Sequence, residues 1–152
     1  MASHSVEFVI IGGVAISLHS SGYLTNDIDF CFSRDRQNLK RIVAALESLQ
    51  PRPRNFPAEL PFIWDEQTLL GGTVFTLITS IGEIDLLAEV AGVGNYDEVH
   101  EHSSVFDLSG YKVNVLSVAG LIKAKRAAGR TKDLLVLPEL EALQEVLDSK
   151  DD

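Results

Sequence analysis

The sequence predicts a mixed α+β domain, with helices packed on a mixed β-sheet and a short helical segment at the C-terminus. Short runs rich in Val, Ile and Phe, bounded by Gly, Ser and Pro, are typical of strands. Apolar residues at helical spacing predict an amphipathic helix in the first third. Two capped helical segments follow one another near the end. We expect residues 1–152 to form a single domain, with residues 116–148 as a C-terminal helical segment packed on it.

The composition is that of a globular protein. The 152 residues are enough to bury one ordinary core, and 45% apolar with 23% charged residues argue against disorder. The formal charge of −9 would repel nucleic-acid backbones over much of the surface. This charge disfavours a protein that coats DNA, but it is compatible with a small substrate bridged by metal ions.

The single cysteine and the absence of a long apolar run indicate a cytoplasmic protein. Cys31 cannot form an internal disulfide, which fits a reducing compartment. The apolar stretch 8–18 is interrupted by two glycines, lacks a preceding basic region and is too short to span a bilayer. We therefore expect no membrane partner.

The first third predicts strand, helix, strand and helix. Residues 6–11 are a short apolar run typical of a buried strand, and Gly12 and Gly13 end it and open a helix to Ser20. Residues 27–32 form the second strand. Ser33 is the expected N-cap of a helix over 34–49, whose apolar side contains Leu39, Ile42, Val43, Leu46 and Leu49.

Prolines dominate the next segment and predict a long loop without regular structure, at Pro51, Pro53, Pro57 and Pro61. Arg52 and Arg54 in this loop either cover a substrate or are solvated, and the pattern favours solvation. Residues 60–65 suggest a short edge segment with Trp64 packed over the sheet.

Two hairpins and two helices complete the prediction. The hairpins join 73–79 with 83–90, and 105–108 with 111–116. Ser117 should cap a helix over 118–128 that Gly129 ends, and Thr131 should cap the next helix, which Pro138 breaks or kinks. Residues 96–102 contain Asp, Glu and His, but neighbouring exposed ligands without a distant anchor are typical of a surface segment.

Three aspartates are the candidate chemical groups. In a strand over 27–32, Asp27 and Asp29 point to the same face, and two such carboxylates are costly to hold together without a cation. Asp85 lies within an otherwise apolar strand, where a carboxylate must be paired, solvated or bound to metal. These hard oxygen donors suit Mg²⁺, with Mn²⁺ as the alternative ion.

The pair Gly12 and Gly13 is a second candidate site. Backbone N–H groups at a helix start favour anions, and glycine lets a phosphate approach closely. A tight strand-to-helix turn would explain the same residues and, taken alone, is the better interpretation. The aspartate pair downstream makes phosphate binding preferable.

The order of these motifs resembles the nucleotidyltransferase superfamily that includes DNA polymerase beta. The resemblance rests on the apolar strand, Gly12-Gly13, the short helix, Gly22-x-x-Thr25-x-Asp27-Ile28-Asp29 and the later Asp85, and it covers residues 6–147. Within the superfamily, the chain resembles the small bacterial branch of minimal and abortive-infection-type nucleotidyltransferases. The resemblance implies a nucleotidyltransferase-like mixed sheet.

The resemblance also implies roles for individual residues. Asp27, Asp29 and Asp85 would be the catalytic residues and the ligands of two Mg²⁺ ions, with Asp85 helping to deprotonate the attacking hydroxyl. The nucleotide would be bound by Gly12, Gly13, Thr25, Lys125, Arg130 and Lys132, with Asp133 orienting one of the basic residues. Lys125, Arg130 and Lys132 belong to a cluster of five basic residues among positions 123–132. Ordinary charge on a helix surface is an equally good explanation of this cluster.

The chain departs from this family at two points that bear on activity. Gly13 stands where many relatives have Ser, which removes a hydroxyl that could contact phosphate. Tyr23 and Leu24 stand where many relatives carry Arg or Lys, so a phosphate-neutralising cation must come from elsewhere.

The predicted function is transfer of an NMP group from a nucleoside triphosphate such as ATP to an acceptor that the sequence leaves open: a protein, an RNA end or a small molecule. The main alternative is a catalytically weak or inactive nucleotidyltransferase-like binding module, such as one component of a toxin–antitoxin pair. Phosphatases of the haloacid dehalogenase type and glycosyltransferases also use Asp-x-Asp. The polar segment before Asp27 fits the phosphatases badly, and glycosyltransferase domains are usually larger.

Overall fold

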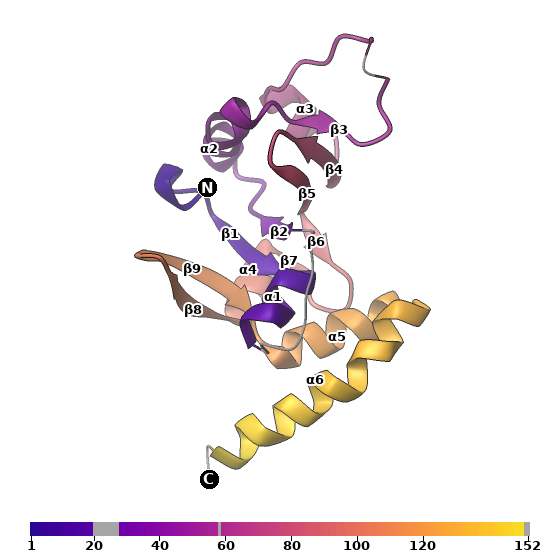
Figure 1. Ribbon diagram of the computed structural model, residues 1–152. Coiled ribbons are helices and arrows are strands. Elements are labelled where there is room, and N and C mark those ends of the chain that lie inside the picture. Colours follow the sequence, from indigo (N-terminus) through magenta and orange to yellow (C-terminus); the bar gives the residue numbers. More distant parts are fainter. Residues whose placement is uncertain (20–27, 58, 151–152) are drawn as a thin grey trace.

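The computed structural model describes residues 1–19, 28–57 and 59–150 (Figure 1). Within these residues, seven strands form one sheet in the order β3-β4-β5-β2-β1-β9-β8. The strands are β1 Phe8–Ile11, β2 Ile28–Phe32, β3 Arg52–Pro53, β4 Val74–Thr79, β5 Gly82–Leu87, β8 Ser103–Leu108 and β9 Tyr111–Leu116. The mixed sheet with helices confirms the predicted α+β class.

The sheet is mixed because two of its strand pairs are parallel. β2 runs parallel to β5, and β1 runs parallel to β9, whereas the other neighbours are antiparallel. A separate two-stranded ribbon joins β6 Glu89–Val90 to β7 Gly94–Asn95. β2 is therefore held on both sides, by β1 and by β5, and its side chains have fixed neighbours.

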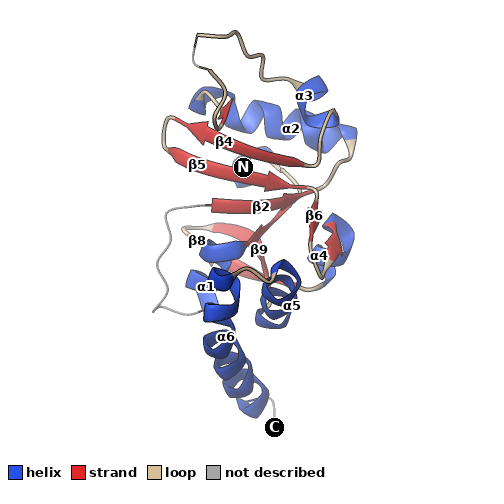
Figure 2. Ribbon diagram, turned by 90° about the vertical axis from the view of Figure 1, so that its right-hand side faces the viewer, coloured by secondary structure: helices blue, strands red, loops and turns tan. Residues whose placement is uncertain are grey.

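The described residues form six α-helices around the sheet. They are α1 Gly12–His19, α2 Arg36–Leu46, α3 Glu66–Leu70, α4 Tyr96–Glu101, α5 Val118–Ala128 and α6 Thr131–Lys150. α2 and α3 pack near β4, while α1, α5 and α6 lie toward the opposite end (Figures 1 and 2). In the described part of the chain, no helix combines the length and apolar character needed to cross a membrane.

The core follows the two-residue period of the strands. Phe30 pairs with Leu86 on one face of β2 and β5, and Phe32 and Leu86 are fully buried. Each such side chain contributes roughly 2 kcal/mol or more through burial. The opposite face carries Asp29 and Asp85, so the same alternation that builds the core presents the carboxylates together.

The helix after β2 begins two residues later than predicted. Ser33 was expected as its N-cap, but the Asp35 side chain accepts the capping hydrogen bond from the Gln37 N–H, at 3.0 Å. Ser33 instead accepts a bond from the Asp35 N–H, at 3.3 Å, and so shapes the turn before the helix. The last predicted turn, Glu47–Leu49, is a separate 3₁₀ helix.

The proline-rich segment contains a strand that the sequence did not predict. β3 pairs with β4, with Arg52 opposite Ile78 and Pro53 opposite Leu77. Proline is tolerated here because β3 is an edge strand, and an outward-facing edge position needs no N–H. The expectation of a loop without regular structure was therefore wrong at these two residues.

Residues 60–65 form no strand, contrary to the prediction. Trp64 packs against the core, and its indole N–H donates to the Val43 carbonyl of α2 at 3.0 Å. The Asp65 side chain then caps the short helix α3 by accepting from the Thr68 N–H at 3.0 Å. The segment thus packs against α2 rather than extending the sheet.

α5 has its predicted caps, whereas α6 begins at Thr131, the residue expected as its N-cap, and has no break at Pro138. Ser117 caps α5, and Gly129 ends it in the left-handed conformation, with φ 63°. α6 continues across Pro138 without interruption. Leu134, whose carbonyl Pro138 cannot bond, is half exposed, so water can satisfy that group. The final turns of α6 extend away from the sheet (Figure 2), and the single-domain organisation stays a prediction.

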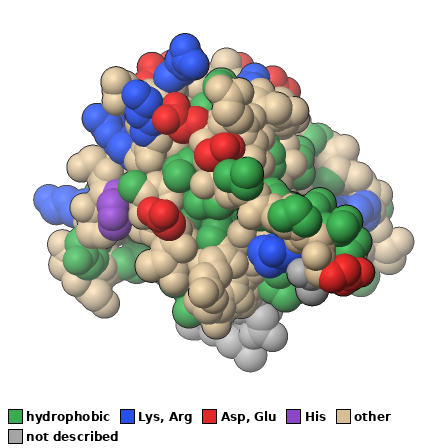
Figure 3. Space-filling model, turned by 90° about the horizontal axis from the view of Figure 1, so that it is seen from above, with side chains coloured by type: hydrophobic (Ala, Val, Ile, Leu, Met, Phe, Trp, Pro, Cys, Tyr) green, Lys and Arg blue, Asp and Glu red, His purple; other side chains and the backbone are tan. Residues whose placement is uncertain are grey.

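Seen from the end that carries α2 and α3, Lys and Arg side chains gather mainly at one side, and apolar side chains are interspersed with acidic and other side chains over the rest of the face (Figure 3). α2 and the residues just before it supply exposed basic residues at Arg34, Arg36, Lys40 and Arg41. Their exposure fits the solvated face of an amphipathic helix.

Asn38 should be important for stability because it joins two segments within the core. It is 1% exposed, accepts from the Glu7 N–H at 2.6 Å, and donates to the carbonyls of Glu7 and Ser33 at 3.0 and 2.8 Å. We expect Asn38→Ala to lower the free energy of unfolding by about 2–4 kcal/mol, because these backbone groups lose their partner. Urea denaturation measures the change. The exposed neighbour variant Gln37→Ala should stay within about 0.5 kcal/mol, and an equal loss in both variants would contradict the prediction.

Candidate active site

The structure places Asp29 and Asp85 side by side. They are direct register partners on the parallel strands β2 and β5, so both side chains leave the same face. Neighbouring strands lie about 4.8 Å apart, which brings the carboxylates within reach of a common cation. The Asp85 side chain is 25% exposed, so this pair is open to solvent on one side.

Gly12 packs directly against Asp29. Ile11, the last residue of β1, is the register partner of Asp29, and Gly12 follows with φ 66°, in the left-handed region. A Cβ on Gly12 would collide with Asp29 Oδ2. The glycine is therefore required both by its backbone conformation and by the space that the carboxylate occupies.

The remaining N-terminal candidates divide into described and undescribed residues. Gly13 is in the first turn of α1, and its carbonyl accepts from the Ser17 hydroxyl at 3.0 Å. Thr25 and Asp27 lie outside the described residues. Among the described residues, no three His, Cys, Asp or Glu side chains converge as a metal site. Asp29 and Asp85 are thus the two described members of the predicted triad.

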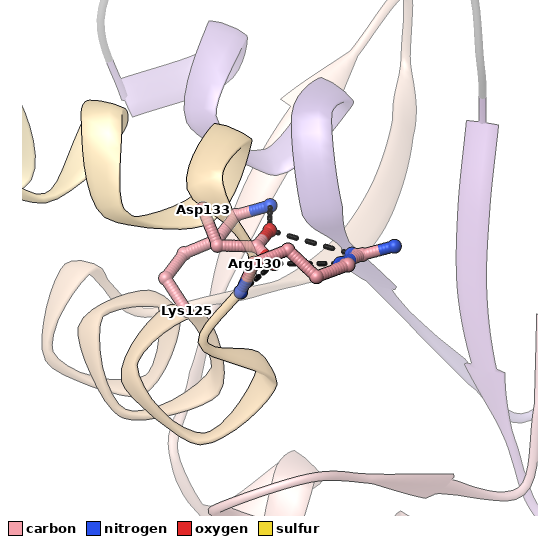
Figure 4. Close-up of polar contacts among 3 residues, drawn as sticks. All are labelled: Lys125, Arg130 and Asp133. Carbon is pink, nitrogen blue, oxygen red and sulfur yellow. Dashed lines mark hydrogen bonds and ion pairs between the residues drawn. The ribbon is translucent and has the colours of Figure 1, made fainter.

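The basic C-terminal segment is organised by a buried carboxylate (Figure 4). Asp133 is 0% exposed and accepts from Arg130 Nε at 2.7 Å and from Lys125 Nζ at 3.2 Å. It also accepts from the Arg130 backbone N–H at 3.2 Å. Asp133 therefore fixes both basic side chains at the junction of α5 and α6.

The ionisation of this cluster follows from these contacts. Burial alone would raise the pKa of Asp133, but the hydrogen bonds from Arg130 and Lys125 outweigh it and lower the pKa below its usual 3.8. The hydrogen bond to Asp133 raises the pKa of Arg130, and the charge of Asp29 adds to this effect. Arg130 therefore stays positively charged, and Asp29 is one of the two carboxylates that favour this charge.

A small cavity lies between this cluster and the strand ends. Its volume is about 160 Å³, and its lining includes Gly12, Leu87, Leu121, Lys125, Arg130 and Asp133. The structure therefore brings Gly12, Lys125 and Arg130 to one place. Lys132 is exposed on α6 and does not line this cavity.

The comparisons with known proteins agree on the fold. No protein-family model and no curated protein matches the sequence. Among solved structures, TM1012 of Thermotoga maritima, a proposed nucleotidyltransferase, aligns with a TM-score of 0.51 and 13% identity over 97% of this chain and 88% of that one. A nucleotidyltransferase-like antigenic protein from Paracoccidioides brasiliensis gives a TM-score of 0.52 and 15% identity over 95% and 70%.

The chain has the nucleotidyltransferase fold. A third solved structure, ANT(2")-Ia in complex with adenylyl-2"-tobramycin, aligns at a TM-score of 0.48 and 18% identity over 99% of this chain and 91% of that one. The resemblance inferred from the sequence is confirmed at the level of the fold, and the narrower bacterial branch stays a prediction.

In this nucleotidyltransferase fold, Arg54 lies beside the paired carboxylates, a position that the sequence did not predict. Arg54 was expected to be solvated, but its Nη2 lies 2.7 Å from Asp85 Oδ1 and its Nε 3.7 Å from Glu83 Oε1. The pairing of β3 with β4 carries it there, and this register depends on contacts between distant segments. The only local sign of this position in the sequence was the alternation of Arg52 and Arg54 around Pro53.

Gly12→Ala should destabilise the fold more than an ordinary glycine substitution does. The new Cβ would collide with the Asp29 carboxylate, and the backbone is in the left-handed region. We expect a loss of about 2–4 kcal/mol in the free energy of unfolding. Gly110→Ala is the matched control, because Gly110 also has positive φ, 91°, but open space around its Cβ. Equal losses for the two variants would contradict close packing of Gly12 on Asp29.

Asp133 should make stability depend on pH. Because its pKa is lowered in the folded state, its contribution is complete above the ordinary value of 3.8 and is lost as the pH falls through the folded value. We expect Asp133→Asn to lower the free energy of unfolding by about 1–3 kcal/mol at pH 7. The difference from the wild type should narrow as the pH approaches 3, in urea denaturation at each pH. For the control Asp148→Asn, at an exposed carboxylate, the difference from the wild type in free energy of unfolding should not narrow in this way. If the difference for Asp133→Asn stays constant with pH, the assignment is refuted.

Proposed function

We propose that the chain is a metal-dependent nucleotidyltransferase that moves an NMP group from a nucleoside triphosphate to an acceptor: an acceptor oxygen bonds to the α-phosphorus, and pyrophosphate leaves. The observation that supports it is the placement of Asp29 beside Asp85, with Gly12 packed against Asp29 and Arg130 lining the same cavity as Gly12. Paired carboxylates flanked by a glycine turn and a guanidinium suit a phosphorylated ligand that carries a divalent cation.

The described residues fit a divalent cation by their donor chemistry. Asp29 and Asp85 offer hard carboxylate oxygens from adjacent strands, as Mg²⁺ or Mn²⁺ prefers. Asp27, two positions before Asp29, would be the third ligand. Two bound Mg²⁺ ions would neutralise charge at the α-phosphorus and lower the pKa of the acceptor hydroxyl.

The chain's own groups would bind and orient the triphosphate. Gly12 and Gly13 would direct backbone N–H groups at the start of α1 toward the β- and γ-phosphates. Arg130, 61% exposed but fixed by Asp133, keeps N–H groups available for phosphate oxygens. Lys125 is held by the same carboxylate, and Thr25 and Lys132 would complete the contacts.

The donor we propose is ATP, and the acceptor is a protein side chain, an RNA end or a small molecule. Glu83 lies two residues before Asp85 on the same face of β5, and its side chain is 42% exposed. Together with the formal charge of −9, this carboxylate favours acceptors that are not extended polyanions. A cytoplasmic location fits the one buried cysteine, Cys31.

The second candidate function is a binding module with weak or no catalysis, such as a toxin–antitoxin component. Apolar side chains exposed along α6 favour a protein partner: Leu134, Leu135, Val146 and Leu147. The departures at Gly13 and Leu24 are compatible with this function.

Substitution of the paired carboxylates tests the enzyme. Incubation with α-labelled ATP, Mg²⁺ and cell extract should label an acceptor with the wild-type protein. Asp29→Asn and Asp85→Asn should each reduce labelling by about 10²-fold or more, because charge at the transferred phosphorus is no longer compensated. Gel autoradiography and thin-layer chromatography detect protein, RNA and small-molecule products.

Asp97→Asn is the control, because Asp97 is exposed in the first turn of α4, outside the site. Undiminished labelling by the Asp29→Asn/Asp85→Asn double variant would refute the assignment. Calorimetric titration with ATP separates the two functions. Mg²⁺-dependent binding supports the enzyme, and absence of binding by the folded wild-type protein supports the module.

A further inference from the structure

The unexpected residue Arg54 belongs to a row of side chains that crosses the sheet. The Arg54 backbone N–H donates to the Thr76 carbonyl at 2.8 Å, which continues the β3–β4 pairing by one residue. Thr76 is the register partner of Asp85, and Asp85 is the partner of Asp29. Arg54 therefore stands in line with both carboxylates, on the side away from Gly12.

The Arg54 guanidinium supplies positive charge where the carboxylates would otherwise repel one another. Two carboxylates on adjacent strands destabilise the fold unless a cation offsets their charge. Arg54 contacts Asp85 at 2.7 Å and Glu83 at 3.7 Å, and its side chain is 29% exposed. Its position is thus that of a resident counter-cation on the Asp85 side of the pair.

The chain around Arg54 holds it at this position. Arg52 Nη2 donates to the Pro57 and Leu60 carbonyls at 3.1 and 2.9 Å, and its guanidinium lies 5.6 Å from the centre of the Phe56 ring. Asn55 adopts a left-handed conformation, with φ 67°. Arg52 is therefore held by contacts on both sides of residue 58, and the backbone of Arg54 is fixed by its hydrogen bond to Thr76.

The geometry points to direct competition between Arg54 and a divalent cation for Asp85. Arg54 Nη2 donates to Asp85 Oδ1, and its charge lowers the affinity of the carboxylate for a second cation. Binding of the cation then weakens the Arg54–Asp85 pair and frees the guanidinium on the β4 side of the site. Arg54 is a positioning residue that sets the affinity for metal. This inference rests on the proposed metal site.

Mn²⁺ titration of the full chain without nucleotide, followed by electron paramagnetic resonance of the free ion, tests this competition. Arg54→Gln should bind Mn²⁺ about threefold to tenfold more tightly than the wild type, as expected from removal of a partly exposed charge pair. Arg54→Lys keeps the charge but lacks the planar fork, so its affinity should lie between the two. Circular dichroism confirms that each variant is folded.

Arg126→Gln is the matched control, because it removes one positive charge from a pair with Glu141 elsewhere on the molecule. Its Mn²⁺ affinity should equal that of the wild type. Equal or weaker affinity in folded Arg54→Gln, or an equal gain in Arg126→Gln, would overturn the competition.

Asp85→Asn separates this inference from the proposed function. If Asp85→Asn abolishes Mn²⁺ binding and Arg54→Gln does not strengthen it, the metal site stands and only the competition fails. If Asp85→Asn leaves Mn²⁺ binding unchanged, the proposed metal site and the competition both fail. Tighter binding in Arg54→Gln that disappears in the Arg54→Gln/Asp85→Asn double variant supports both.

Discussion

The parallel pairing of β2 with β5 is the constraint on which the site depends. It places Asp29 next to Asp85, and at a separation of about 5 Å two carboxylates repel by roughly 3 kcal/mol at an effective dielectric constant of about 20. The rest of the structure compensates for this repulsion. Phe30, Phe32 and Leu86 anchor the same strands in the core from the other face, so the carboxylates cannot move apart without losing buried apolar contacts.

Two arginines offset the negative charge of the Asp29–Asp85 pair, one from each side of the pair, and different contacts hold each of them. On the Gly12 side, Arg130 is held at the α5–α6 junction by Asp133, a carboxylate that is itself fully buried. The charge of Asp29 contributes to raising the pKa of Arg130. On the opposite side, Arg54 reaches Asp85 from an edge strand of two residues. The first cation is fixed by a buried ion pair, whereas the second is fixed by backbone pairing and remains partly exposed.

Much of this arrangement could be predicted from the sequence because it depends on local periods and caps. The two-residue alternation assigned Asp29 and Asp85 to the faces opposite Phe30 and Leu86, and Ser117 and Gly129 bounded α5. The register between segments could not be predicted, because no local pattern specifies which distant strands pair. For this reason Arg54 was missed, and the prolines around it argued for a loop. The burial of Asp133 is likewise a consequence of how α5 packs on α6.

Arg130 and Arg54 would respond differently to binding of a metal ion at the proposed site. Arg130 contacts a carboxylate that is inaccessible to a metal ion, so binding of a cation at Asp29 and Asp85 leaves the Arg130–Asp133 pair intact. Arg54 contacts a carboxylate that the metal would share. Loading of the proposed metal site would therefore change the charge balance only on the β4 side, next to Arg54. Under the proposed function, such a site would keep Arg130 preformed for the nucleotide and would couple the position of the Arg54 guanidinium to the presence of the metal.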